Sequence, residues 1–289
     1  MTGSSFVGRV VVLLSALALV AGPASADESA VVATARDLLT KHHEAVVWVS
    51  AVVTVQIPGG ARSAEQEAET LGTVVDPSGL VLISLEAMNP VSRLTRLGVN
   101  VRTPAGVNLH DIKSSLSQVK IRLADGTEVP AKVVLEDSDL GLSFLRPDPP
   151  SEGTEPRTFV SIPLAEGAAA EVLDRVIELR RLGKTLDNEP TVALDRVTAV
   201  IKKPRELFCT STKGDGTPVF TTDGKLLGIA VSHSDGTSVV VPTIDIVPIA
   251  EQAKESAPAE DAPADDAAAD DAPADTPAED APADDAAPQ

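Results

Sequence analysis

The middle of the chain alternates between short Val-rich runs and tight-turn signals, and this pattern constrains the fold more than any other feature. Apolar runs flank Asp76-Pro77-Ser78-Gly79, Ala124-Asp125-Gly126-Thr127 and Asp223-Gly224. Gly, Asp and Pro at such places favour reversal of the chain between neighbouring strands. Strands are predicted at 45–55, 71–75, 80–84, 119–123, 129–135 and 140–145, and then at 176–182, 192–201, 207–210, 218–221, 226–231 and 238–241.

Two halves with about six strands each predict an all-β fold of two six-stranded antiparallel β-barrels, with short N-terminal and C-terminal helices. Five Phe, one Trp and no Tyr mean that the core must be built from Val, Leu, Ile and Ala. Pro248 weakens the prediction of the C-terminal helix. The predicted segments are a leading helix at 27–44, a first β-barrel at 45–146, a linker at 147–157, and a second β-barrel with a terminal helix at 158–254.

Residues 1–26 are typical of a secretory signal peptide. Arg9 precedes an apolar run of 13 residues at 10–22, which is too short to span a bilayer, and Ala24-Ser25-Ala26 matches a cleavage site. We therefore expect a mature chain that starts at Asp27, is exported to the periplasm or the cell exterior, and has no stable membrane insertion. An uncleaved N-terminal anchor is the alternative.

Residues 255–289 repeat the string Asp-Ala-Pro-Ala-Asp and contain 12 acidic residues and no basic ones. They therefore supply most of the net charge of −19. Pro, like charges and the lack of an apolar face predict a disordered tail. The simplest role is a solvating spacer, and weak multivalent cation binding or attachment to a basic partner are the alternatives.

The composition argues against several kinds of site. An acidic balance with few aromatic side chains argues against nucleic-acid binding. One cysteine, Cys209, cannot close an internal disulfide, and four scattered histidines do not complete a zinc finger. Cys209 lies in an apolar run and is expected to be a buried, inert thiol. No cofactor is predicted.

Three motifs in the body resemble the trypsin-like serine peptidase fold in its bacterial HtrA/Deg form. LGTVVDPSGLVL at 71–82 is similar to the hairpin that leads to the catalytic His of that family. VKIRLADG at 119–126, followed by PAKVV, is similar to the hairpin that leads to the catalytic Asp. GDGTPVF at 214–220, followed by DGKLLGI, is similar to the segment that holds the nucleophile. The acidic tail follows the second barrel, so no PDZ domain is expected.

The resemblance implies a Ser–His–Asp triad, but all three positions are replaced. Counting from the motifs places Glu86 at the His position, Gly141 at the Asp position and Asp215 at the nucleophile position. A carboxylate is a poor nucleophile, and it would place negative charge beside the donors that stabilise an oxyanion. Loss of triad members removes on the order of 10⁴- to 10⁶-fold of the rate, so no catalytic residue is predicted.

In the family fold, Glu86 and Asp215 would face each other across the cleft between the barrels. Two close carboxylates share a proton, bind a cation or are neutralised by a nearby base. Lys213 is two residues from Asp215 and could supply that positive charge. A charge-paired remnant of a triad, a weak cation site at Glu86 and Asp215, and acid–base chemistry are the three alternatives.

Other polar residues are expected to be structural. Asp139, predicted on the same strand face as Gly141, cannot act without a His or Ser, and His110 lies in an apparent insertion at 88–118. A solvated strand edge is predicted for Arg175, Arg180 and Arg181.

The sequence thus favours a catalytically inactive pseudo-peptidase that acts as a binding or scaffold protein. Its partner would be a protein or extended peptide, held in the cleft or at a strand edge. The first alternative is a serine-type endopeptidase or hydrolase of the HtrA/Deg type with a rebuilt or misaligned site. The second is an all-β extracellular adhesion module, in which Glu86, Gly141 and Asp215 would not converge.

Overall fold

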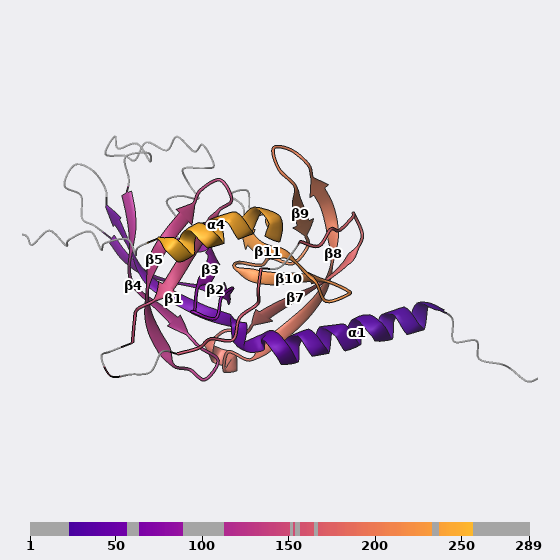
Figure 1. Ribbon diagram of the computed structural model, residues 1–289, viewed down its shortest axis with the longest axis horizontal. Coiled ribbons are helices and arrows are strands. Elements are labelled where there is room, and N and C mark those ends of the chain that lie inside the picture. The colour runs from indigo at the N-terminus through magenta and orange to yellow at the C-terminus, as the bar shows by residue number, and fades with distance from the viewer. Residues whose placement is uncertain are drawn as a thin grey trace, which may run out of the picture. The chain divides into compact units, whose positions relative to one another are not determined.

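The structure, a computed structural model, describes residues 23–56, 64–88, 113–150, 153, 157–164, 167–232 and 237–256. Its strands form two closed barrels, and all strand pairs are antiparallel (Figure 1). The strand order is β1-β2-β3-β6-β5-β4 in the first barrel and β10-β11-β12-β9-β8-β7 in the second. The predicted fold of two six-stranded antiparallel barrels is therefore confirmed.

The strands follow the predicted runs closely. The first barrel contains β1 (Val46–Gln56), β2 (Ala64–Val74), β3 (Val81–Ser84), β4 (Lys113–Arg122), β5 (Glu128–Asp137) and β6 (Leu142–Pro147). The second contains β7 (Arg175–Arg181), β8 (Pro190–Ile201), β9 (Leu207–Thr210), β10 (Thr217–Thr221), β11 (Leu226–Ser232) and β12 (Ser238–Pro242). The helical elements are α1 (Pro23–His42), η1 (His43–Ala45), α2 (Leu85–Met88), η3 (Lys184–Leu186) and α4 (Thr243–Glu255).

Two strands in the first barrel begin earlier than predicted. β2 starts at Ala64 because its polar first half pairs with the long β1, for example Glu67 opposite Val52. β4 starts at Lys113, inside the segment that was predicted to be an insertion. The predicted insertion at 88–118 is therefore wrong at its C-terminal end, and the rest of it, including His110, lies outside the described residues.

Glycines make the predicted turns possible. Gly126 and Gly224 have φ angles of +82° and +85°, which side chains with a Cβ rarely adopt. The amide of Gly126 donates to the carbonyl of Leu123, and that of Gly224 to the carbonyl of Thr221. Both hairpin turns are thus confirmed. Asp139 and Gly141, in contrast, lie in the turn before β6 and not on a common strand face.

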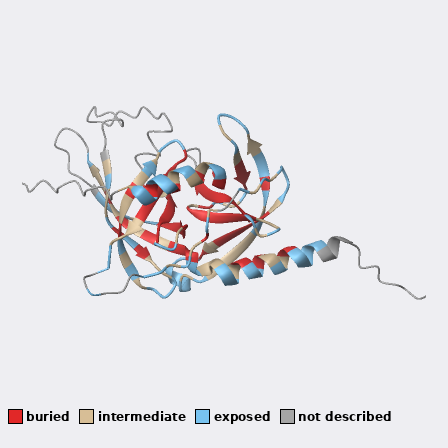
Figure 2. Ribbon diagram, in the orientation of Figure 1, coloured by how far each residue is buried: buried red, intermediate tan, exposed pale blue. Residues whose placement is uncertain are grey.

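Buried residues follow the strands of both barrels (Figure 2). Fully buried side chains include Val49 and Leu145 from the first barrel and Ile177 from the second, and these belong to one continuous cluster. Cys209 is buried, as predicted. Burial of this apolar area is the main driving force that brings the two barrels together.

The terminal helices pack on the barrels. Helix α1 buries Val31, Ala35 and Leu38, whose spacing of four and three residues places them on one face. Helix α4 continues through Pro248 as far as Glu255. The guanidinium of Arg146 donates to the last carbonyls of α4, among them that of Ala253, which satisfies acceptors that have no partner within the helix.

The predictions of a signal peptide and of a disordered tail concern the two ends of the chain. The apolar run at 10–22 and the acidic segment from residue 257 lie outside the described residues. The backbone of Ala24-Ser25-Ala26 lies in the first turn of α1. In the described part of the chain, every helix is too short or too polar to cross a membrane.

Candidate functional site

A cleft of about 390 Å³ lies where the two barrels meet. The first barrel supplies residues from β1, β2 and α2, and the second supplies residues from β7, β11 and the segment before β10. We call residues 213–216 the cleft loop. The cleft is lined by Trp48, Glu69, Thr70, Leu71, Glu86, Ala87, Arg180, Lys213, Asp215 and Ser232.

Two of the three positions that the motifs assigned to a triad lie at this cleft. Glu86 and Asp215 both line it, from α2 and the cleft loop. Gly141 is not part of the described lining, and its carbonyl oxygen accepts a hydrogen bond of 2.8 Å from the amide of Leu85, the residue before Glu86. Glu86 and Asp215 thus line one cleft between the barrels, and their assignment to triad positions stays a prediction.

Asp215 is held by backbone. Its Oδ1 accepts a hydrogen bond of 3.0 Å from the amide of Ser232 on β11. No ion pair joins Lys213 to Asp215 in the described residues, so the predicted neutralisation by this lysine is not seen. Lys213 is instead an exposed cation at the cleft.

The cleft loop ends at a glycine that the geometry requires. Gly216 has a φ angle of +72°, and a Cβ there would collide with the backbone oxygen of Leu71 in the first barrel. The buried hydroxyl of Thr73 donates a hydrogen bond of 2.7 Å to the carbonyl of Gly216. The amide of Gly216 donates to the carbonyl of Ala230. These contacts tie the loop to both barrels.

The three arginines of the β7 region do not form a solvated strand edge, so that prediction is wrong. Arg181 is only 7 % exposed and donates to the carbonyls of Val46 and Asn188. Arg175 pairs with Glu28 of α1. Arg180 lines the cleft. The sequence pattern could not show this, because the carbonyl partners of Arg181 come from other elements.

Sequence reasoning also missed Glu178, a carboxyl buried beside the cleft loop. It is 2 % exposed on β7 and accepts a hydrogen bond of 2.6 Å from the hydroxyl of Thr217. Burial raises the pKa of Glu178, against the hydrogen bond from Thr217 and the charge of Arg180, which lower it. Its place within the apolar run of β7 was the signal that could have identified it.

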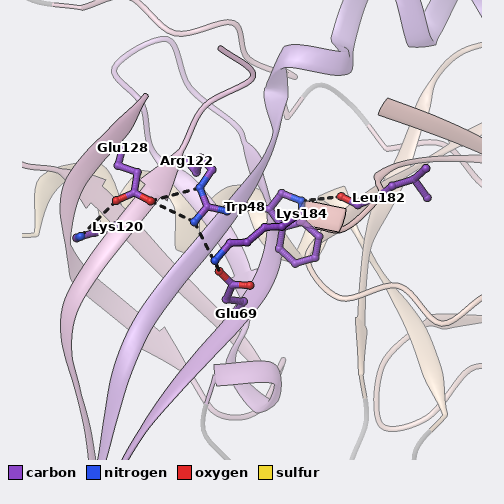
Figure 3. A network of polar contacts seen from close by, with 7 residues as sticks. All are labelled: Trp48, Glu69, Lys120, Arg122, Glu128, Leu182 and Lys184. Atoms are coloured by element: carbon purple, nitrogen blue, oxygen red, sulfur yellow. Dashed lines mark hydrogen bonds and ion pairs between the residues drawn. The ribbon is translucent and has the colours of Figure 1, made fainter. Parts of the chain in front are cut away.

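A network of polar contacts (Figure 3) includes Trp48 and Glu69, which both belong to the lining of the cleft. The indole nitrogen of Trp48 donates a hydrogen bond of 3.0 Å to the carbonyl of Leu182, which links the two barrels. Glu69 pairs with Lys184 and with Arg122, which lies 3.6 Å away. We call this set the rim network: Trp48, Glu69, Lys120, Arg122, Glu128, Leu182 and Lys184.

The described lining of the cleft contains no histidine and no cysteine. Among the described residues, no group of three or more His, Cys, Asp and Glu side chains is arranged to hold a metal ion. The cation site at Glu86 and Asp215 therefore stays a prediction that rests on two carboxylates. His110 and His233 lie outside the described residues.

Comparison of the chain with protein-family models and with curated proteins gives no match in either case. The two closed six-stranded barrels are consistent with a trypsin-like fold. The finer resemblance, to the HtrA/Deg form, is carried by the three motifs.

Proposed function

We propose that this chain is an exported pseudo-peptidase of the trypsin-like fold that binds a protein or extended peptide without cleaving it. The observation that carries this proposal is the cleft between the barrels, which Glu86 and Asp215 both line. The motifs assign these two residues to the positions of a base and a nucleophile. With a carboxylate at each position, the cleft can still hold a polypeptide, but it lacks the nucleophile and the base that acyl transfer requires.

The described hydroxyl groups near Glu86 and Asp215 support the absence of a substitute nucleophile. Ser84 and Ser143 are fully buried on β3 and β6, so a substrate cannot reach them. Ser232 lines the cleft, but the described lining offers it no histidine as a base. Activation of a serine needs access to the substrate and an adjacent base within hydrogen-bond reach, and the burial of Ser84 and Ser143 supports a binding role over the rebuilt-hydrolase alternative. His233, which follows Ser232, lies outside the described residues.

The lining of the cleft suits a polypeptide ligand. Trp48 offers an aromatic surface, Thr70 and Ser232 carry hydroxyls, and charges of both signs are present at Arg180 and Asp215. Both barrels are closed, so the described strands offer no free edge for strand addition. We therefore place the ligand in the cleft and not at a strand edge.

Catalytic inactivity is tested with the full chain by fluorophosphonate labelling and a casein turnover assay. We expect no covalent label and no turnover above the uncatalysed rate. Labelling of Ser232, or of any other serine, would overturn the proposal and support the misaligned-nucleophile alternative.

Peptide binding is tested by panning a phage-displayed library of linear peptides against the immobilised protein. We expect enriched peptides whose binding is lost in Ala87→Phe, which fills the cleft, because Ala87 is part of its lining. Leu194→Phe is the matched control, since Leu194 is an exposed position on β8 outside that lining. Equal binding by both variants would place the ligand elsewhere.

Export is supported by the signal-like sequence at 1–26. Expression of the full chain in a bacterial host should give protein outside the cytoplasm whose N-terminal sequence starts at Asp27. Intact, cytoplasmic protein that retains Met1 would contradict this part of the proposal.

A further inference from the structure

Glu178 is an acidic residue of β7, and the residues before and after it in the strand are apolar and fully buried. It lies opposite Val219 of β10 and Ala193 of β8, between Ile177 and Leu179. A carboxyl in such a place is costly to ionise, because it loses most of its hydration. The chain nevertheless has a carboxyl here, directly behind the cleft.

The carboxyl of Glu178 packs against the cleft loop itself. A Cβ added to Gly214 would collide with Oε1 of Glu178 and with the hydroxyl of Thr217, so the carboxyl occupies the space above the Cα of Gly214. Thr217, the first residue after the loop, donates its hydroxyl to the same Oε1. The loop is fixed from its other side by Ser238, whose Oγ accepts from the amide of Gly214.

Charged groups face Glu178 from three directions. Arg180, on the same strand, has its Nε 3.7 Å from Oε1. Asp195 from β8 and Asp215 from the cleft loop add negative charge that disfavours ionisation. When Glu178 is protonated, repulsion of Asp215 is removed and Arg180 is less strongly attracted. When Glu178 is ionised, it repels Asp215 and attracts Arg180.

We propose that Glu178 is a proton-responsive latch that sets the position of the cleft loop and the charge of the ligand-binding cleft. This inference rests on the proposed function, because the loop carries Lys213 and Asp215 into the cleft and Arg180 lines it. Protonation of Glu178 leaves the guanidinium of Arg180 more available to a ligand, and ionisation draws that guanidinium toward the carboxylate of Glu178.

The single tryptophan makes the latch measurable without any ligand. Trp48 is the only Trp in a chain with no Tyr, it lines the cleft, and its indole bonds to Leu182 just after β7. A pH titration of its emission, with circular dichroism in parallel, should show a transition above the range of an ordinary carboxyl in the folded protein. Glu178→Gln should abolish that transition.

Two further variants test whether the pH transition of the Trp48 emission belongs to Glu178. Thr217→Val removes a hydrogen bond that favours the ionised form, so the transition should move to higher pH by about one unit. Glu136→Gln is the matched control. Partial loss of hydration also raises the pKa of Glu136, but this residue is exposed on β5 and is not part of the cleft lining. It should leave the transition unchanged.

Three results would reject the proposal that Glu178 is a latch. The emission of Trp48 in the folded wild type shows no pH transition, Glu178→Gln retains the transition, or Thr217→Val leaves its pH unchanged. Each outcome is independent of the panning experiment. Peptide capture without a transition would reject the latch and keep the proposed function. A transition without peptide capture would reject the proposed function, and with it the role of the latch in ligand binding.

Discussion

The rim network and the interior behind the cleft both contain acidic side chains, but these side chains have different partners in the two regions. At the rim, Glu69 and Glu128 each meet a cation at the surface (Figure 3). At the wall of the cleft, the half-buried Asp215 is held by a backbone amide, and in the interior behind it the buried Glu178 is held by a hydroxyl. Exposed ion pairs contribute little to stability, whereas buried polar groups depend on every hydrogen bond they make. We therefore expect mutations in the interior to matter most.

The largest effect is expected where the cleft loop touches the first barrel. Gly216→Ala adds a Cβ against the oxygen of Leu71 at a φ angle of +72°, and we expect a loss of about 3 kcal/mol or more of unfolding free energy. Urea unfolding measures it. Gly126→Ala is the control, because its φ angle is similar and nothing lies near its Cβ; it should lose about 1–2 kcal/mol. Equal losses would show that the loop is not tightly packed.

A smaller effect is expected from the hydrogen bond that joins the barrels beneath the cleft. Thr73→Val keeps the shape of a fully buried side chain but removes the donor to Gly216, and it should cost about 1–3 kcal/mol. Thr40→Val, at an exposed position on α1 whose hydroxyl bonds within its own helix, should change stability by less than about 0.5 kcal/mol. If Thr73→Val left the free energy of unfolding unchanged, water would have replaced the hydroxyl as the donor to Gly216.

The comparison also predicts opposite pH dependences for two glutamates. The pKa of Glu178 is raised by burial, so its contribution to stability is full below its unfolded pKa and is lost as the pH rises through its folded pKa. Glu178→Gln should therefore become more stable relative to the wild type as the pH rises from about 4 to 8.

Glu128 should show the reverse. Hydrogen bonds from Arg122 and Lys120 lower its pKa, so its contribution is present above the unfolded pKa and is lost as the pH falls through the folded one. Relative to the wild type, Glu128→Gln should thus be least stable at neutral pH. Urea unfolding over the same pH range checks both variants, and slopes of the same sign would contradict the distinction between rim and interior.

The fold was largely predictable because strand runs and turns are local signals. Strand β9 was predicted at its observed bounds, 207–210, and turns form at Gly126 and Gly224 as expected. The first half of β2 was missed because Glu and Gln have low β propensity, and this segment is a strand only through its register with β1.

The site was predictable only in part. From the motifs, Glu86 and Asp215 were expected to lie at one cleft, and both residues line the cleft of the structure. This expectation was possible because turn spacing determines which residues lie at the ends of a barrel. The burial of Arg181 and Glu178 depends on partners far away in the chain, such as Val46 and Thr217. No periodicity in a single strand reports such contacts, so both residues were left out of the predicted site.

The smallest effect is expected at the rim. Lys184→Gln removes a cation that pairs with Glu69, but both side chains are substantially exposed and Arg122 remains close to the same carboxylate. The loss should be below about 1 kcal/mol and should shrink further in 1 M salt, since screening weakens exposed pairs. Urea unfolding at low and high salt tests this. A loss as large as that of Thr73→Val would place the rim network among the buried contacts that hold the barrels together, and the distinction between rim and interior would fail.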